Sequence, residues 1–240
     1  ERRTGKDFDP PEEIPAEMWG YDDHLGWHEQ KDGHLYVGIY IENGRIQDTE
    51  EKKQRSQIRR IVEKFRPQVR ITPQQNLVLS HIKPEDKEEI QRILDEGAIS
   101  SGNGWLSTLR RREIACVALP TCGLALAEAE RVTPHLITQL EEMGYGDDDV
   151  HIRVSGCPNS CSRAPMAEIG LLGRGPGKYN LYLGGDYFGS RTNQLFKETV
   201  RYEELAPEIA RLLKRWRNER QDGEYFGDYC LRVGLEALKE

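Results

Sequence analysis

The sequence has 240 residues, enough for one large or two smaller domains, and its 37% hydrophobic and 31% charged residues are typical of globular chains. Its formal net charge of -7 argues against nucleic acid as a partner, because phosphate binding needs a concentrated positive surface. No apolar run approaches the roughly 20 residues of a membrane-spanning helix, and no signal peptide opens the chain, so we expect a cytoplasmic protein that does not bind membranes.

Residues 1–17 are charged and include Pro10, Pro11 and Pro15, a composition typical of linkers. We therefore expect the chain to be part of a longer protein. A loop rich in Ser and Gly near residue 100 separates two expected domains, at 18–98 and 99–240.

The first domain is expected to contain a strand, a helix, two strands and a second helix. These cover residues 34–41, 49–65, 69–71, 77–82 and 83–96. Asn43-Gly44 favours a hairpin turn after the first strand because both residues tolerate positive φ. Pro67 ends the first helix and Gly97 caps the second. This order predicts a small mixed sheet with helices on one face.

The second domain is also expected to alternate strands and helices. Helices are predicted over residues 122–131, 133–144 and 207–217, and strands over 151–155, 168–172 and 180–183. Thr133-Pro134 fits the start of a helix, and the glycine-rich run at 173–177 fits a hairpin connection better than a phosphate loop. The whole chain is therefore predicted to be α/β.

Four of the five cysteines form two close pairs with C-x5-C and C-x3-C spacing. They are Cys116, Cys122, Cys157 and Cys161. Four thiolates from two chain segments are the soft ligands that a metal ion or an iron–sulfur cluster requires, and Pro120, Gly156 and Pro158 can bend the intervening loops. Spacing alone thus predicts a four-cysteine metal or cluster protein.

Other interpretations of the cysteines stay open at this point. Disulfides are disfavoured in a chain without secretory features. Structural zinc usually has two to four residues between paired ligands, fewer than in the first pair, and purely structural cysteines are not excluded by spacing. Cys230 has no cysteine nearby in the sequence and is interpreted as a small core residue.

Residues 115–130 and 156–161, which contain the four cysteines, resemble the two cysteine segments of the siroheme-dependent sulfite and nitrite reductases. Further segments resemble that family in the same order, at residues 26–30, 42–45, 71–76, 179–185 and 223–228. The resemblance covers nearly all of residues 18–235 and is greatest to the C-terminal half of assimilatory sulfite reductases.

The resemblance implies a ferredoxin-like half-domain at 18–98, followed by a 4Fe-4S and siroheme-binding domain at 99–240. In the family, cysteines at these four positions bind a [4Fe-4S] cluster, and the thiolate matching Cys161 also bridges to the siroheme iron. The implied reaction is the six-electron reduction of sulfite to sulfide, with nitrite to ammonia as the alternative. A zinc-stabilised module without catalysis is the alternative outside the family.

The resemblance also indicates cofactor contacts outside the cysteines. Arg70, Gln75 and Asn76 lie in a segment similar to a haem-facing segment of the family and are candidate siroheme contacts. Gly156 and Asn159 are expected to bring backbone N–H groups near the cluster sulfurs. Beyond Cys161 no catalytic residue is expected in this half, because the family's anion-binding arginines and lysines come from the N-terminal half.

The expected partners are sulfite or nitrite, that N-terminal half, and an electron donor that is either ferredoxin or a flavoprotein. Residues 163–173 and 179–185 resemble the sulfite branch, and residues 26–30 resemble the ferredoxin-dependent enzymes. Basic residues between 52 and 70 and at 110–112 could dock an acidic ferredoxin or could simply form solvated helix faces. We expect the chain alone to be inactive.

Overall fold

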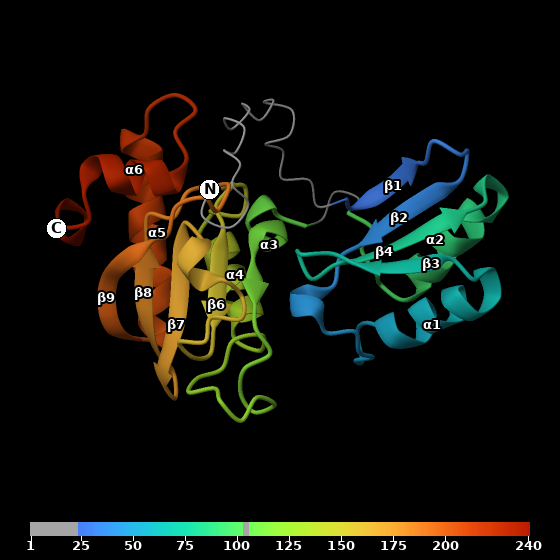
Figure 1. The fold of residues 1–240 in the computed structure, drawn as a ribbon, viewed down its shortest axis with the longest axis horizontal. Coiled ribbons are helices and arrows are strands. Elements are labelled where there is room, and N and C mark those ends of the chain that lie inside the picture. The colour runs from blue at the N-terminus through green and yellow to red at the C-terminus, as the bar shows by residue number, and fades with distance from the viewer. Residues whose placement is uncertain (1–23, 103–105) are drawn as a thin grey trace, which may run out of the picture.

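Two β-sheets lie side by side in the computed structural model, which describes residues 24–102 and 106–240 (Figure 1). Each sheet has its own hydrophobic core and its own helices. The α/β class is therefore confirmed. The linker expected at residues 1–17 lies outside the described residues. Within the described part of the chain, no helix combines the length and apolarity needed to cross a bilayer.

The first sheet has four strands in the order β1-β2-β4-β3. Its elements are β1 (Gly26–Glu29), β2 (Leu35–Ile39), α1 (Gln54–Phe65), β3 (Gln68–Ile71), β4 (Leu77–Ile82) and α2 (Lys87–Glu96). All three strand pairings are antiparallel, whereas a mixed sheet was expected. Both helices cover one face, where Ile61 of α1 and Ile93 of α2 are fully buried against Leu79.

The turn after β2 has the predicted backbone but not the predicted role. Asn43 and Gly44 adopt positive φ values of 49° and 73°, as the dipeptide allows. They lie in a short 3-10 helix, Glu42–Gly44, and do not join a hairpin, because β2 pairs with β1 and β4. The turn instead directs the chain toward the second sheet.

The second sheet has five strands in the order β5-β6-β7-β8-β9. Its strands are β5 (Ile114–Ala115), β6 (Ile152–Ser155), β7 (Ile169–Gly175), β8 (Lys178–Leu183) and β9 (Gln194–Arg201), and its helices are α3 (Thr108–Arg112), α4 (Thr133–Glu142), α5 (Tyr202–Glu219) and α6 (Phe226–Val233). The first three strands are parallel and the last three antiparallel. The sequence patterns missed β5, β9, α3 and α6, whereas the hairpin after β7 is confirmed.

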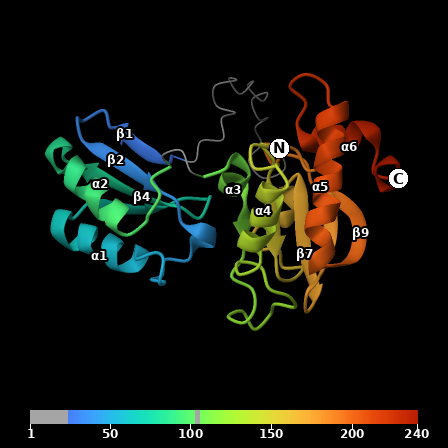
Figure 2. The ribbon, with the colours of Figure 1, turned by 180° about the vertical axis from the view of Figure 1, so that it is seen from behind.

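Helices α4 and α5 pack against the second sheet, as Figure 2 shows from behind. Their buried side chains include Leu136, Leu140, Ile209 and Trp216. The parallel pairing of β5 with β6 has a direct consequence for the cysteines, since parallel strands end at the same edge of a sheet. Cys116 follows β5 and Cys157 follows β6, so the two cysteine segments leave the sheet together.

The segment at residues 122–131 forms turns, so the predicted helix there is wrong. The backbone N–H groups of Leu126 and Ala127 donate to the Gly156 carbonyl at 2.8 and 3.0 Å. These bonds join the first cysteine segment to the second. The tertiary pairing thus satisfies donors that a helix would otherwise have used, and it overrides the local helix propensity.

Candidate functional site

All four paired cysteines line one cavity of about 340 Å³ beside the carboxyl ends of β5 and β6. The cavity also includes Gln75, Asn159 and Arg163. Cys157 is buried, Cys116 and Cys122 are partly exposed, and Cys161 is exposed at the surface. The fold therefore brings the C-x5-C and C-x3-C pairs to a common site, with Cys161 as the most exposed residue of the four.

Backbone hydrogen bonds fix the position of Cys116. Its N–H donates to the Val154 carbonyl at 3.0 Å, and its own carbonyl accepts from the Glu130 N–H at 3.0 Å. The Gly156 N–H donates to Cys116 Sγ at 3.2 Å, as expected for that glycine. A donor aimed at sulfur stabilises the thiolate and tunes the potential of a bound cluster.

Gly156 lies where the two cysteine segments approach most closely. A Cβ built at this position would lie 2.5 Å from Ala118 Cβ and 2.6 Å from the Ala127 carbonyl oxygen. Neither neighbour is a flexible side-chain end, so only glycine fits. The close approach also allows the Gly156 carbonyl to accept the two N–H bonds from the first segment.

Burial raises the pKa of the Cys116 thiol above its ordinary value, and the nearby Cys161 and Cys157 raise it further. The Gly156 N–H acts in the opposite direction. Cys116 is therefore a thiol at neutral pH in the free chain. Binding of a metal centre would displace that proton, because the thiolate is the ligand.

The number and type of the cysteine donors fit an iron–sulfur cluster, whose usual ligands are four thiolates. In the described residues, no three His, Cys, Asp or Glu side chains are gathered closely enough to hold one metal ion. A cubane cluster binds each thiolate through a different iron, so its four ligands surround a cavity and do not meet at a single point. All four cysteines line the one cavity, so the ligand number for such a cluster is present there.

Comparisons with known proteins indicate which proteins the chain resembles. The family model described as "Nitrite/Sulfite reductase ferredoxin-like half domain" matches residues 28–97. The chain is 45% identical to the sulfite reductase [NADPH] hemoprotein beta-component of Lysinibacillus sphaericus over 237 residues, and 41% identical to that of Staphylococcus haemolyticus over 239. Residues 28–97 thus match the half-domain of the nitrite and sulfite reductase family, and nearly the whole chain is similar to sulfite reductase hemoprotein components.

The alignments cover 97% and 98% of the chain but only 41% of each of these two relatives. The chain thus spans about two fifths of the length of the curated relatives it matches. Among solved structures, the Mycobacterium tuberculosis NirA protein has the same fold, with a TM-score of 0.73 over 97% of the chain and 43% of that protein at 24% identity. Dissimilatory sulfite reductase I aligns with a TM-score of 0.61 at 12% identity, over 85% of the chain and 68% of that protein.

The other candidate cofactor residues of this chain lie in different places. Gln75 and Asn159 line the cysteine cavity. Asn76 is buried, and its side-chain oxygen accepts from the Ile41 N–H at 3.0 Å. Arg70 donates to the Ser80 hydroxyl at 2.6 Å on the exposed strand β3. Asn76 and Gln75 also line a neighbouring cavity of about 540 Å³, which shares Gln75 and Val117 with the cysteine cavity.

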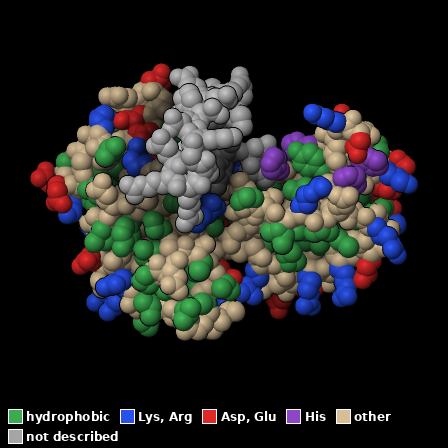
Figure 3. All heavy atoms as spheres, in the orientation of Figure 1, with side chains coloured by type: hydrophobic (Ala, Val, Ile, Leu, Met, Phe, Trp, Pro, Cys, Tyr) green, Lys and Arg blue, Asp and Glu red, His purple; other side chains and the backbone are tan. Residues whose placement is uncertain are grey.

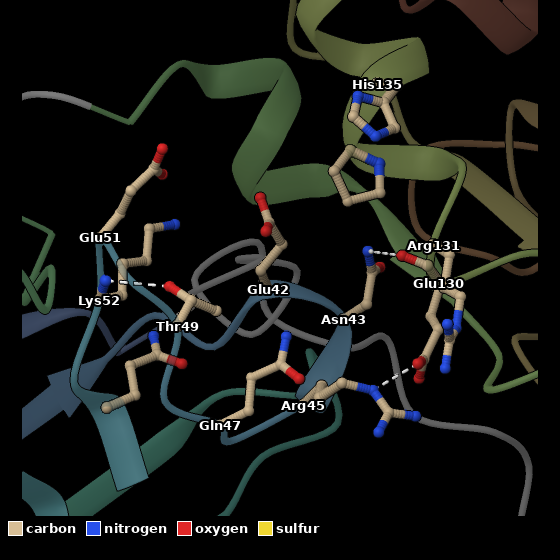
Figure 4. A pocket seen from close by; sticks show the side chains of 12 residues that line it. Glu42, Asn43, Arg45, Gln47, Thr49, Glu51, Lys52, Glu130, Arg131 and His135 are labelled. Atoms are coloured by element: carbon tan, nitrogen blue, oxygen red, sulfur yellow. Dashed lines mark hydrogen bonds and ion pairs between the residues drawn. The ribbon is translucent and has the colours of Figure 1, made fainter. Parts of the chain in front are cut away.

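Several residues near the site were not predicted from the sequence. Arg163 lines the cysteine cavity, and only its position two residues after Cys161 could have indicated it. Figure 4 shows Asn43 and Arg45 reaching toward Glu130 from the turn after β2. The Arg45 guanidinium pairs with the Glu130 carboxylate, and Asn43 donates to the Glu130 carbonyl at 3.3 Å. No local sequence signal links these positions.

The basic residues that could have docked an acidic ferredoxin are largely paired within the chain. On α1, Arg59 pairs with Glu63, Arg60 with Glu96 of α2, and Lys64 with Glu89 of α2. In α3, Arg110 pairs with Glu141 and Glu42, and Arg112 with Asp149. Figure 3 accordingly shows Lys and Arg interspersed with Asp and Glu over the face in view. For α1, these ion pairs therefore fit a solvated helix face better than a docking site for an acidic ferredoxin.

Cys230 lies away from the other cysteines in the fold as well as in the sequence. It is fully buried on α6 within the core of the second sheet and does not line the cysteine cavity. Burial raises its pKa well above the ordinary value. The interpretation of Cys230 as a small core residue is confirmed.

Proposed function

We propose that this chain is the cofactor-binding C-terminal half of an assimilatory sulfite reductase. In this proposal Cys116, Cys122, Cys157 and Cys161 hold a [4Fe-4S] cluster, and Cys161 also ligates the iron of a siroheme. The single observation that carries the proposal is the common cavity lined by all four cysteines in a chain that resembles this family. The siroheme with its cluster would pass six electrons from an external donor to sulfite, which is thereby reduced to sulfide.

The protein's own residues bind and orient these groups. Cys161 is the exposed member of the set, so its sulfur can face a second cofactor while the buried Cys157 faces inward. The Gly156 N–H stabilises negative charge on the Cys116 sulfur. The neighbouring cavity lined by Gln75, Asn76 and Val117 offers a surface on which a macrocycle could lie beside the cluster.

Sulfite is preferred over nitrite because the bacterial relatives are sulfite reductases by name. Their names also specify NADPH and a hemoprotein beta-component, which favours a flavoprotein donor over ferredoxin. The ion pairs of the basic residues on α1 also favour a flavoprotein donor, because these residues already have acidic partners within the chain. A cytoplasmic location, the inactivity of the chain alone and the need for an N-terminal half remain predictions.

The test is to purify the protein that contains this chain under anaerobic conditions and to measure colour, iron and acid-labile sulfide. We expect a coloured protein with a cluster and a siroheme, whose cluster is lost on Cys122→Ser or Cys157→Ser. A colourless protein with one zinc per chain would replace the proposal by the zinc module. Supplying sulfite and nitrite separately and assaying sulfide and ammonia then distinguishes the two substrates.

A further inference from the structure

Gln75 lies in the turn between β3 and β4, yet its side chain bonds to the second domain. Its Nε2 donates to the Ala115 carbonyl at 2.8 Å, and its Oε1 accepts from the Ala115 N–H at 3.2 Å. One side-chain amide thus engages both backbone polar groups of one residue. Gln75 has a φ of 64°, in the left-handed region that is uncommon for residues other than glycine.

Ala115 is the residue immediately before Cys116 and the last residue of β5. This strand is at the edge of the second sheet, where β6 is its one neighbour among the described strands. Ala115 would therefore present an unpaired N–H and C=O on its outer side. The Gln75 amide takes the place of a neighbouring strand there, with the same donor and acceptor pattern.

Two residues of the first domain also hold the backbone after Cys116, through Glu130. The Cys116 carbonyl accepts from the Glu130 N–H, and Glu130 is itself held by Asn43 and Arg45. Figure 4 shows these two side chains at Glu130. Two turns of the first domain, one before α1 and one between β3 and β4, thus fix the backbone on both sides of this cysteine.

We propose that Gln75 is a positioning residue for Cys116: it acts as a side-chain strand partner for Ala115 and so fixes the first cysteine at the cavity. Its role in the reductase is to hold a cluster ligand, in addition to any contact with the siroheme. This inference rests on the proposed function, because it assigns a purpose to the position of Cys116. It also makes the first domain a determinant of the cluster's surroundings.

Two substitutions separate the amide pairing from other effects. Gln75→Asn keeps the amide and the tolerance for a left-handed backbone, but its side chain is too short to reach Ala115. Gln75→Glu keeps the length but turns a carboxylate oxygen toward the Ala115 carbonyl. The matched controls are Gln139→Asn and Gln139→Glu, at an exposed position on α4.

The experiment uses the full cofactor-loaded protein and its cofactor-free form. In the cofactor-free form, we expect amide exchange of residues 114–118 to be about tenfold faster in both Gln75 variants, because Asn loses both hydrogen bonds and Glu replaces the bond to the Ala115 carbonyl by a repulsion between two oxygens. In the loaded protein, we expect a shifted midpoint potential and an altered electron paramagnetic resonance spectrum of the reduced cluster. The Gln139 variants should match the wild type in all three measurements.

The outcomes are distinguishable. A wild-type protein that contains no cluster overturns the proposed function and, with it, the purpose assigned to Gln75. A wild-type protein with a cluster, together with Gln75 variants whose exchange, potential and spectrum are unchanged, overturns the positioning role alone. Faster exchange with an unchanged potential and spectrum also overturns it, since Gln75 would then support the fold without affecting the cluster.

Discussion

The Tyr40 hydroxyl donates a hydrogen bond of 3.2 Å to Glu113 Oε1, which joins the strand end of the first domain to the start of β5 in the second. Both side chains are buried, and the second oxygen of Glu113 has no hydrogen-bond partner among the described residues. Burial raises the pKa of Glu113 from 4.5 to about 8, although Arg110 and Tyr40 act in the opposite direction. Glu113 is therefore protonated in the folded protein at pH 7.

This shift predicts a loss of stability as the pH rises. Between pH 4.5 and about 8 the unfolded chain releases the Glu113 proton while the folded chain keeps it, so unfolding is favoured progressively. Glu113→Gln removes this titration and keeps an acceptor for Tyr40. We expect the free energy of unfolding of the variant, relative to wild type, to rise by about 2–4 kcal/mol from pH 5 to pH 8.5. Urea unfolding at the two pH values measures this difference, and equal differences at both would contradict the assignment.

The largely buried ion pairs of Arg110 are expected to stabilise the contact between the two sheets' domains. Its guanidinium contacts Glu141 at 2.6 Å, Glu42 of the first domain at 3.1 Å and the Thr138 hydroxyl at 2.8 Å, and only 13% of its side chain is exposed. We expect Arg110→Met to destabilise the protein by about 2–3 kcal/mol, because it leaves two partly buried carboxylates without their cation. The measurement is the midpoint of urea unfolding.

The matched control for Arg110 is Arg59, which also pairs with a glutamate. Arg59 and Glu63 are 77% and 68% exposed, so water already screens their charges. We expect Arg59→Met to change stability by less than about 0.5 kcal/mol. Comparable losses for Arg59→Met and Arg110→Met would show that burial does not distinguish the two pairs.

The cysteines differ in exposure, and this predicts an order of chemical reactivity. Cys161 is exposed, whereas Cys230 is fully buried and its pKa is raised by burial. In the folded protein without its cluster, we expect a thiol reagent to modify Cys161 first and Cys230 only on unfolding, since the reactive species is an accessible thiolate. Mass spectrometry of the labelled peptides gives the order. Early labelling of Cys230 under native conditions would refute its place in the core.

The elements that the sequence predicted are those whose pattern is local. Helix α1 ends before Pro67, and α4 starts at Thr133-Pro134, as their own residues indicate. Strand β4 matches its predicted range because its apolar residues and flanking turns are adjacent in the chain. The shared site of the four cysteines was predicted from their spacing and from the family resemblance, and neither needed side-chain geometry.

The errors occurred where distant segments decide the structure. The run at residues 122–131 has strong helix propensity, but Leu126 and Ala127 bond to Gly156, about thirty residues later. The contacts of Gln75 with Ala115 and of Asn43 with Glu130 join positions 40 and 87 residues apart. A periodic pattern cannot indicate such contacts, because they depend on how the two domains meet.

The two glycines near the cysteines differ in the space around them, and this predicts opposite outcomes for one substitution. At Gly156 an added methyl group would meet Ala118 Cβ and the Ala127 carbonyl inside van der Waals distance. Gly156→Ala must therefore push the two cysteine segments apart, which also lengthens the N–H bond to Cys116 Sγ. We expect a loss of most bound iron and acid-labile sulfide and a destabilisation of about 2–3 kcal/mol.

Gly123 provides the control for that substitution, because it follows Cys122 directly and has nothing within 4 Å of an added Cβ. Gly123→Ala should therefore retain the iron and sulfide of the wild type, with a stability change of less than about 1 kcal/mol. Iron and sulfide assays on the two anaerobically purified variants make the comparison at equal protein concentration. Since both changes add one methyl group beside a cysteine segment, a difference between them depends on the close approach at Gly156. Equal cluster content in the two variants would contradict this prediction, because the two cysteine segments could then separate at Gly156 and still bind the cluster.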